Sequence, residues 1–210
     1  MTLFNIDCST GLNELTPESV DIIFTDPPYL KDIYKEAYTV LATEGMKALR
    51  PGGWMISYAP QFHLPEVFNI LTGAGLEYYW TIAQLNNQAN CLIFSRNVMA
   101  MWKPIIIFAK PPVSKPPHAF CDRISGKKMK KYHPWEQSIH EALALLSRFA
   151  SPGDLVVDPF MGSGTVPLAA KLLGLDYIGM EINTDTYHTA LSRIEQQPLD
   201  LNSYCVEGTS

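Results

Sequence analysis

The chain has 210 residues, of which 47% are apolar and 18% charged, and its net charge is −5. This length and composition predict one globular domain over residues 1–210. No run of 18 apolar residues predicts a membrane span, and the N-terminus lacks the pattern of a signal peptide. The four cysteines form no CxxC pair, so the sequence indicates neither a metal site nor a disulfide framework, and we expect a cytoplasmic protein.

Short apolar runs alternate with helical patterns along the chain. Strands are expected at residues 3–6, 20–24, 54–58, 78–84, 102–109, 155–157 and 177–181. Helices are expected at residues 33–50, 63–71, 138–149, 166–173 and 184–196, whereas residues 9–19 and 85–97 are predicted as turns or loops. This alternation predicts an α/β domain with a mainly parallel sheet and helices on both faces.

Residues 111–133 differ from the rest of the chain in composition, because four prolines are followed by a cluster of basic residues. Between Lys110 and His133 the chain carries seven Lys or Arg residues and one acid, which gives this segment a net charge of +6. Such a segment on an acidic protein can bind phosphates, although a solvated loop is the simpler interpretation.

The first motif is Asp26-Pro27-Pro28-Tyr29, which follows the strand expected at residues 20–24. Each proline fixes its own φ and restricts the residue before it, so the strand ends in a stiff corner. The motif holds a carboxylate, an exposed carbonyl and an aromatic ring within four residues. Two acceptors and a ring suit a planar amino group, although Asp and Pro are also common in ordinary turns.

The second motif is Gly162-Ser163-Gly164, which lies between the strand at 155–157 and a helix. Glycines at this place allow close approach of a ligand, and the helix N-terminus offers free N–H groups. The next strand ends in Glu181, 23 residues after Asp158, where a carboxylate can accept hydrogen bonds from a ribose. Pro167 replaces the third glycine of the dinucleotide fingerprint, so a nucleoside without a pyrophosphate fits better.

The two motifs, in this order, resemble the amino-methyltransferases that use S-adenosylmethionine on DNA. The motif DPPY comes first, the cofactor loop DPFMGSGT comes last, and the basic segment lies between them. This order resembles the β group of the family, in which the methyltransferase sheet is circularly permuted. The resemblance covers most of residues 3–196 and implies a Rossmann-like sheet of seven strands, the last antiparallel.

The resemblance also implies roles for individual residues. Asp26, Pro27, Pro28 and Tyr29 match the catalytic set. The residues that match the cofactor site are Asp7, Cys8, Asp158, Phe160, Gly162, Ser163, Gly164, Thr165 and Glu181. Residues 111–133 are the candidate target-recognition insert, and Lys127, Lys128, Lys130 and Lys131 are its candidate DNA contacts, together with Arg96. Lys103 is a further residue that could contact a DNA phosphate. At His133–Ser138 the sequence departs from the family pattern, since Gln137 and Ser138 replace a Lys-Pro pair.

The implied reaction is methyl transfer to the exocyclic amino group of a base that is flipped out of DNA. Family members with Asp at the first motif position are mostly adenine-N6 enzymes, so we expect adenine, with cytosine N4 as the alternative. A cofactor-binding partner subunit and an RNA or protein methyltransferase remain open as further alternatives, as does a homodimer. The resemblance further implies a bacterial or phage-encoded protein of the kind found in restriction–modification systems, and it implies no metal.

Overall fold

A single large sheet forms the centre of the molecule. The computed structural model describes residues 1–30, 33–85, 91–125 and 138–196. Within these ranges the sheet has eight strands in the order β1-β10-β9-β2-β3-β7-β4-β8, and only β7 runs against the others. The strands are β1 (Thr2–Phe4), β2 (Val20–Thr25), β3 (Leu49–Tyr58), β4 (Glu77–Leu85), β7 (Trp102–Ala109), β8 (Arg123–Ile124), β9 (Leu155–Asp158) and β10 (Asp176–Met180).

The topology confirms the mainly parallel sheet with one antiparallel strand. All seven expected strands are present, and the two-residue strand β8 is an eighth for which the sequence gives no signal. Strand β9 comes late in the chain but pairs with β2, with Ile22 opposite Val156 and Ile23 opposite Val157. The strand of the first motif therefore lies beside the strand of the second, and both end at the same edge of the sheet.

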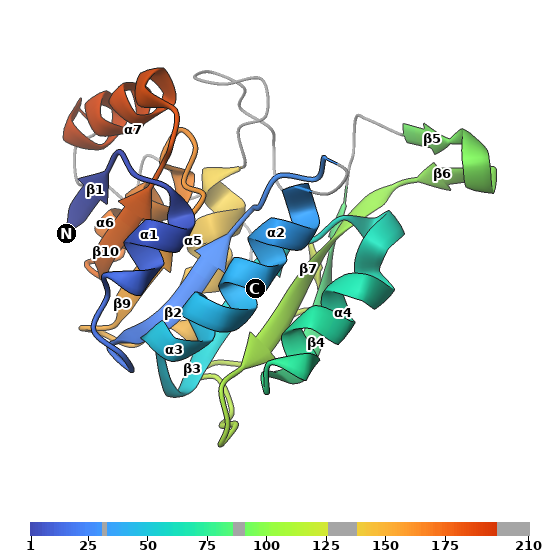
Figure 1. Ribbon diagram of the computed structural model, residues 1–210, viewed down its shortest axis with the longest axis horizontal. Helices are drawn as coiled ribbons and strands as arrows, with labels where there is room; N and C mark the ends of the chain where they lie inside the picture. Colours follow the sequence, from blue (N-terminus) through green and yellow to red (C-terminus); the bar gives the residue numbers. More distant parts are fainter. Residues whose placement is uncertain (31–32, 86–90, 126–137, 197–210) are drawn as a thin grey trace.

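Helices cover both faces of the sheet (Figure 1). Alternate residues of β2 face opposite layers: Ile22 and Phe24 pack toward one set of helices, and Ile23 packs toward the other. One layer consists of α5 (Ile139–Phe149), α6 (Thr165–Leu172) and α7 (Thr184–Gln196). The other consists of α1 (Cys8–Asn13), α2 (Ile33–Val40), a π-helical turn (Leu41–Gly45), α3 (Met46–Ala48) and α4 (Leu64–Gly73), which a 3-10 turn (Gln61–His63) precedes.

The prediction of a turn-like segment at residues 9–19 was wrong for its first part, which forms α1. The carboxylate of Asp7 caps this helix, since its Oδ1 accepts from the backbone N–H of Ser9 at 2.9 Å and of Thr10 at 3.4 Å. Leu12 is buried against the sheet and holds the helix in place. A helix that is held by one capping residue and one apolar contact leaves no periodic pattern in the sequence.

The loop expected at residues 85–97 is also partly structured. A hairpin of β5 (Cys91–Ile93) and β6 (Val98–Ala100) projects from the body of the molecule (Figure 1), joined by a 3-10 turn at Phe94–Arg96. The many Asn and Gln residues of this stretch obscured its two short apolar runs. Because the hairpin lies between β4 and β7 in the chain, it extends from the edge of the sheet at which β2 and β9 end.

The described part of the candidate insert, residues 111–125, packs against the body of the molecule. The ring of Phe120 contacts that of Phe149 in α5 in a tilted arrangement, with centroids 5.0 Å apart, and the carbonyl of Asp122 accepts from the N–H of Ala83 at 2.8 Å. Val113 and Ile124 also contact the core. Among the described residues, no helix is both long and apolar enough to cross a membrane.

Candidate functional site

A cavity of about 540 Å³ lies at the edge where the parallel strands end. Segments that follow β1, β2, β9 and β10 contribute to its wall, so residues far apart in the sequence share one space. The predicted site residues that line it are Asp7, Cys8, Asp26, Pro28, Asp158, Phe160, Gly162, Ser163, Thr165 and Glu181. Both sequence motifs therefore face a single cavity.

Asp158 lies at the end of β9 and is 3% exposed. Its Oδ1 accepts from the hydroxyl of Thr25 at 2.7 Å and from the N–H of Phe160 at 3.1 Å. Burial disfavours the charged carboxylate and raises the pKa of Asp158 to about 7, against the lowering effect of these two hydrogen bonds. Thr25 thus ties the first motif to the second across neighbouring strands.

Glu181 follows β10 and shapes the glycine loop. Its carboxylate accepts from the N–H of Gly162 at 3.1 Å and from the N–H of Asn183 at 2.8 Å. The next residue, Ile182, is 69% exposed and also lines the cavity. An acceptor beside an apolar surface suits a nucleoside, whose ribose offers hydroxyl donors and whose base offers a flat face.

Asp7 and Cys8, at the start of α1, also line the cavity. The Asp7 carboxylate already caps this helix, so it contributes a fixed negative charge. Burial, and after it the charge of Asp7, raises the pKa of the Cys8 thiol to about 11, which keeps the thiol protonated and poorly nucleophilic at neutral pH.

Gly164 does not line the cavity. It is the residue before α6 and has φ +80°, and a Cβ there would lie 3.1 Å from Cβ of Ala190 and 3.2 Å from Cδ1 of Ile194 in α7. Its lack of a side chain therefore serves the contact between α6 and α7. Gly162, whose added Cβ would meet nothing within 4 Å, borders the ligand space instead.

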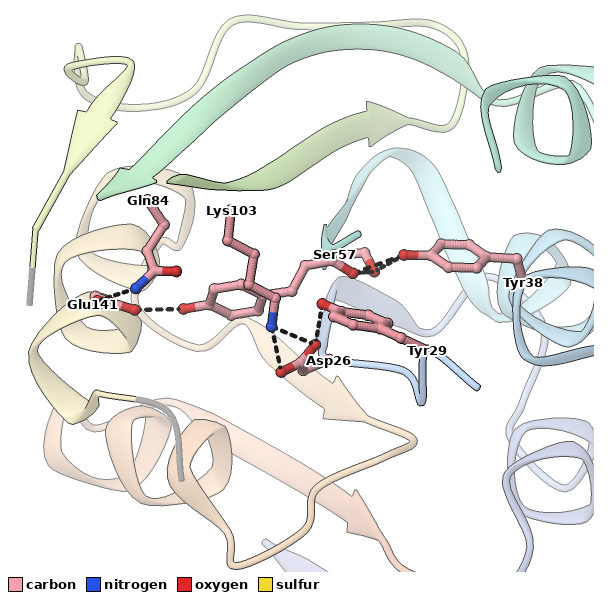
Figure 2. A network of polar contacts seen from close by, with 8 residues as sticks. Asp26, Tyr29, Tyr38, Ser57, Gln84, Lys103 and Glu141 are labelled. Carbon is pink, nitrogen blue, oxygen red and sulfur yellow. Dashed lines mark hydrogen bonds and ion pairs between the residues drawn. The ribbon is translucent and has the colours of Figure 1, made fainter. Parts of the chain in front are cut away.

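The motif Asp26–Tyr29 adopts a compact arrangement with Lys103 (Figure 2). The hydroxyl of Tyr29 donates to Oδ1 of Asp26 at 2.5 Å. The ammonium of Lys103, from the start of β7, lies 3.1 Å from Oδ1 and 3.0 Å from Oδ2 of the same carboxylate. Pro27 is buried behind the corner. Burial, with the nearby charge of Asp26, raises the pKa of Tyr29, so its hydroxyl stays a donor.

A buried polar network lies beside this arrangement (Figure 2). The hydroxyl of Tyr58 donates to Glu141 at 2.9 Å, and the side-chain amide of Gln84 donates to the other oxygen of Glu141 at 3.1 Å. Tyr38 donates to the carbonyl of Tyr58 at 2.7 Å. Glu141 is 1% exposed, so these donors compensate for the removal of its carboxylate from water.

The predicted DNA contacts lie away from the cavity or outside the described residues. Arg96 lies in the turn of the hairpin, with its guanidinium 5.0 Å from the ring centroid of Phe62. The four lysines predicted as phosphate contacts, Lys127, Lys128, Lys130 and Lys131, fall outside the described residues.

Sequence reasoning missed several residues of the site. Thr25, Glu36 and Ile182 line the cavity, and Lys103 contacts the carboxylate of Asp26, although the sequence suggested only a phosphate contact for it. Thr25 and Ile182 are next to motif residues in the sequence, and this position could have identified them as site residues. Glu36 and Lys103 carried no such signal. Within the described ranges, no three His, Cys, Asp or Glu side chains cluster as metal ligands would.

Comparison with known proteins identifies the family. Residues 20–192 match the DNA methylase family. The type II methyltransferase M.HpaI of Haemophilus parainfluenzae is 24% identical, over 89% of this chain and 72% of the relative. The M1.HpyAVI–SAM complex has a TM-score of 0.75 at 24% identity, covering 92% of this chain and 98% of the other. The cytosine-N4-specific PvuII DNA methyltransferase has a TM-score of 0.79 at 17% identity, covering 91% and 85%. Since the family match extends over most of the chain, the protein belongs to the DNA methylase family.

Proposed function

We propose that the protein transfers a methyl group from S-adenosylmethionine to the exocyclic amino group of a flipped DNA base, with N6 of adenine as the favoured acceptor. The observation that carries this proposal is the shared cavity, whose wall includes Asp26 from one motif and Gly162 and Glu181 from the other. A methyl donor and an amine must meet at bonding distance, which this arrangement allows.

The described residues fit the cofactor. Glu181 offers acceptors for the ribose, Ile182 and Phe160 offer apolar surface for the purine, and the carboxylates of Asp7 and Glu36 offer negative charge for the cationic part. When bound, S-adenosylmethionine supplies an electrophilic methyl group. The remaining task of the protein is to hold and activate the amine.

Asp26 and the carbonyl of Pro27 are the activating groups. The lone pair of an exocyclic amine is delocalised into the ring, which makes it a poor nucleophile. Two acceptors for its N–H bonds draw the nitrogen toward a tetrahedral geometry, and they bind it more strongly as it gains positive charge. The ring of Tyr29 would stack on the flipped base, and its hydroxyl bond to Asp26 orients the ring in the protein without DNA.

Adenine is favoured by the aspartate at the first position of the motif, because serine is more typical of cytosine-N4 enzymes. The fold likeness to a cytosine-N4-specific enzyme supports cytosine as the second candidate. An intact catalytic motif argues against a partner subunit without activity, and the motif order argues against an RNA or protein substrate.

The proposed DNA-facing surface includes the hairpin β5–β6 and the insert at residues 111–133. Residues 78–121 contain four Lys or Arg residues and no Asp or Glu, although the chain carries 21 acids. A stretch without acids suits a polyanion. Phe94, at the turn of the hairpin, is 86% exposed and lies two residues from Arg96. A homodimer on DNA is part of this proposal, as is a role in restriction–modification.

The test is expression in a host without DNA methylases, followed by sequencing of the modified bases and mass spectrometry of the nucleosides. N6-methyladenine in a defined sequence is the expected product, and N4-methylcytosine would select the alternative. Asp26→Ala should lower the methylation rate by at least about a hundredfold while S-adenosylmethionine binds nearly as before. Asp176→Ala, which removes an exposed carboxylate of β10, is the matched control. Full activity of the Asp26 variant would contradict the mechanism.

A further inference from the structure

The ammonium of Lys103 occupies a defined position beside the catalytic carboxylate. Lys103 is the second residue of β7, and because β7 is antiparallel, its start lies at the edge where β2 ends. The ammonium contacts both oxygens of Asp26, at 3.1 and 3.0 Å (Figure 2). The two side chains are only 21% and 25% exposed, so solvent screens this pair less than a surface ion pair.

Two aromatic rings fix the ammonium further. It lies 4.6 Å from the ring centroid of Tyr29 and 4.6 Å from that of Tyr58. Such distances are typical of cation–π contacts. Tyr58 is itself held by its hydrogen bond to buried Glu141. The position of the Lys103 head is therefore determined by three neighbours and not by a flexible side chain alone.

The donors of Lys103 exceed the acceptors that the described residues offer it. An ammonium has three N–H bonds, and its hydrogen bonds among these residues both go to Asp26. The third N–H has only the ring faces of Tyr29 and Tyr58 near it, so it can turn to an acceptor atom on a ligand that approaches Asp26. A lysine has no acceptor of its own, so it suits an acceptor atom on that ligand.

Adenine and cytosine both present such an atom. On the Watson–Crick edge of each, the amino group adjoins a ring nitrogen that accepts a hydrogen bond, N1 in adenine and N3 in cytosine. Guanine and thymine carry a ring N–H at the same place. When the base is flipped, this nitrogen loses its partner in the duplex and needs a new donor.

We propose that Lys103 is a specificity-determining residue, whose ammonium donates to the ring nitrogen next to the target amine while Asp26 accepts from the amine. This inference rests on the proposed function. Together, Asp26 and Lys103 recognise an amine beside a ring acceptor. They reject a base with a ring N–H at that place, because this N–H and the ammonium of Lys103 would be two donors facing each other. This role also explains why a cation lies beside Asp26, although the amine itself needs only hydrogen-bond acceptors.

The test compares two duplexes that differ in one atom and carry an abasic site opposite the target base, so that neither target base breaks a base pair when it is flipped. One carries adenine at the target position found by sequencing, and the other carries 1-deazaadenine, in which a C–H replaces N1; for a cytosine target, 3-deazacytosine is used. Affinities are measured with S-adenosylhomocysteine bound, so no turnover is needed. The wild type should bind the deaza duplex about ten- to a hundredfold more weakly, the range for a hydrogen bond to a charged group.

Lys103→Met should bind the two duplexes equally. Any effect of this change on the orientation of Asp26 weakens both complexes alike and cancels in the ratio, which separates base recognition from a purely positioning role. Lys47→Met removes an exposed lysine before the amino end of β3, outside the proposed DNA-facing surface, and should keep the wild-type ratio. Should Lys103→Met not fold, Lys103→Gln, which is shorter and uncharged, should likewise reduce the ratio.

An unchanged ratio in the Lys103 variants would overturn the inference, as would a wild-type protein that does not distinguish the duplexes. A wild-type protein that methylates no DNA base would instead contradict the proposed function. The two failures are therefore distinguishable.

Discussion

Glu181 is the residue whose removal tests the cofactor site most directly. Its carboxylate faces the cavity and is also bonded to the N–H groups of Gly162 and Asn183. Glu181→Ala should weaken S-adenosylmethionine binding by about 1.5–3 kcal/mol, as measured by calorimetry. Glu195→Ala, which removes an exposed acid of α7, should leave the affinity unchanged. Wild-type affinity in the Glu181 variant would remove this residue from the site.

Asp158 should make the stability of the protein depend on pH. Its pKa rises from the ordinary 3.8 to about 7 on folding, so the folded state binds its proton more tightly than the unfolded state. The resulting stabilisation is fully present below about pH 4 and disappears as the pH rises toward 7. Between these limits the free energy of unfolding should fall by at most about 1.4 kcal/mol per pH unit.

Chemical denaturation of Asp158→Asn across pH 4–8 checks this prediction. Asparagine does not titrate, so the variant should lack the slope that the wild type shows. Asp176→Asn, on the exposed end of β10, should retain it. If the free energy of unfolding varied with pH in the same way for the wild type and Asp158→Asn, the Asp158 carboxyl would have an ordinary pKa.

Among the helices, the packing of α6 against α7 depends on one glycine. Gly164 has φ +80° and faces Ala190 and Ile194, whereas Gly174 has φ +70° and open space around it. Gly174→Ala should lower the free energy of unfolding only by the strain of an alanine in the left-handed backbone region, about 1–2 kcal/mol. Gly164→Ala adds overpacking and should cost about 1–3 kcal/mol more, visible as a lower thermal midpoint. Equal destabilisation of the two variants would contradict the packing role.

For the molecule as a whole, a net charge of −5 means that DNA must bind through local basic surface. Replacing Arg96 and the four lysines at 127, 128, 130 and 131 with alanine should weaken binding to every DNA sequence. The slope of log affinity against log salt should flatten by about 0.9 for each phosphate that the variant no longer neutralises. Lys47→Ala, in α3 before the amino end of β3, is the control. A wild-type slope in the combined variant would mean that these residues are solvated.

Most of the architecture could be predicted from the sequence. Buried strands are short β-branched runs, and in a parallel sheet their carboxyl ends share one edge, so the motifs at 26–29 and 158–165 could be predicted to meet. The helices at 138–149 and 184–196 followed from their apolar period. Short elements such as α1 and β8 were not predicted, because each is held by one or two long-range contacts that leave no periodic pattern in the sequence.

The pairing of the Asp26 carboxylate with Lys103, by contrast, depends on how distant elements pack. Lys103 lies 77 residues from Asp26, and nothing near it in the sequence distinguishes it from a lysine that contacts phosphate. The reversed direction of β7 brings its first residues to the edge where β2 ends, and the rings of Tyr29 and Tyr58 then fix the ammonium. Likewise, Gly164 reads as a ligand-binding glycine in sequence, but the approach of α7 makes it a packing residue. Motifs fix the chemistry that a chain can offer, whereas the direction and packing of distant elements fix which groups it brings together.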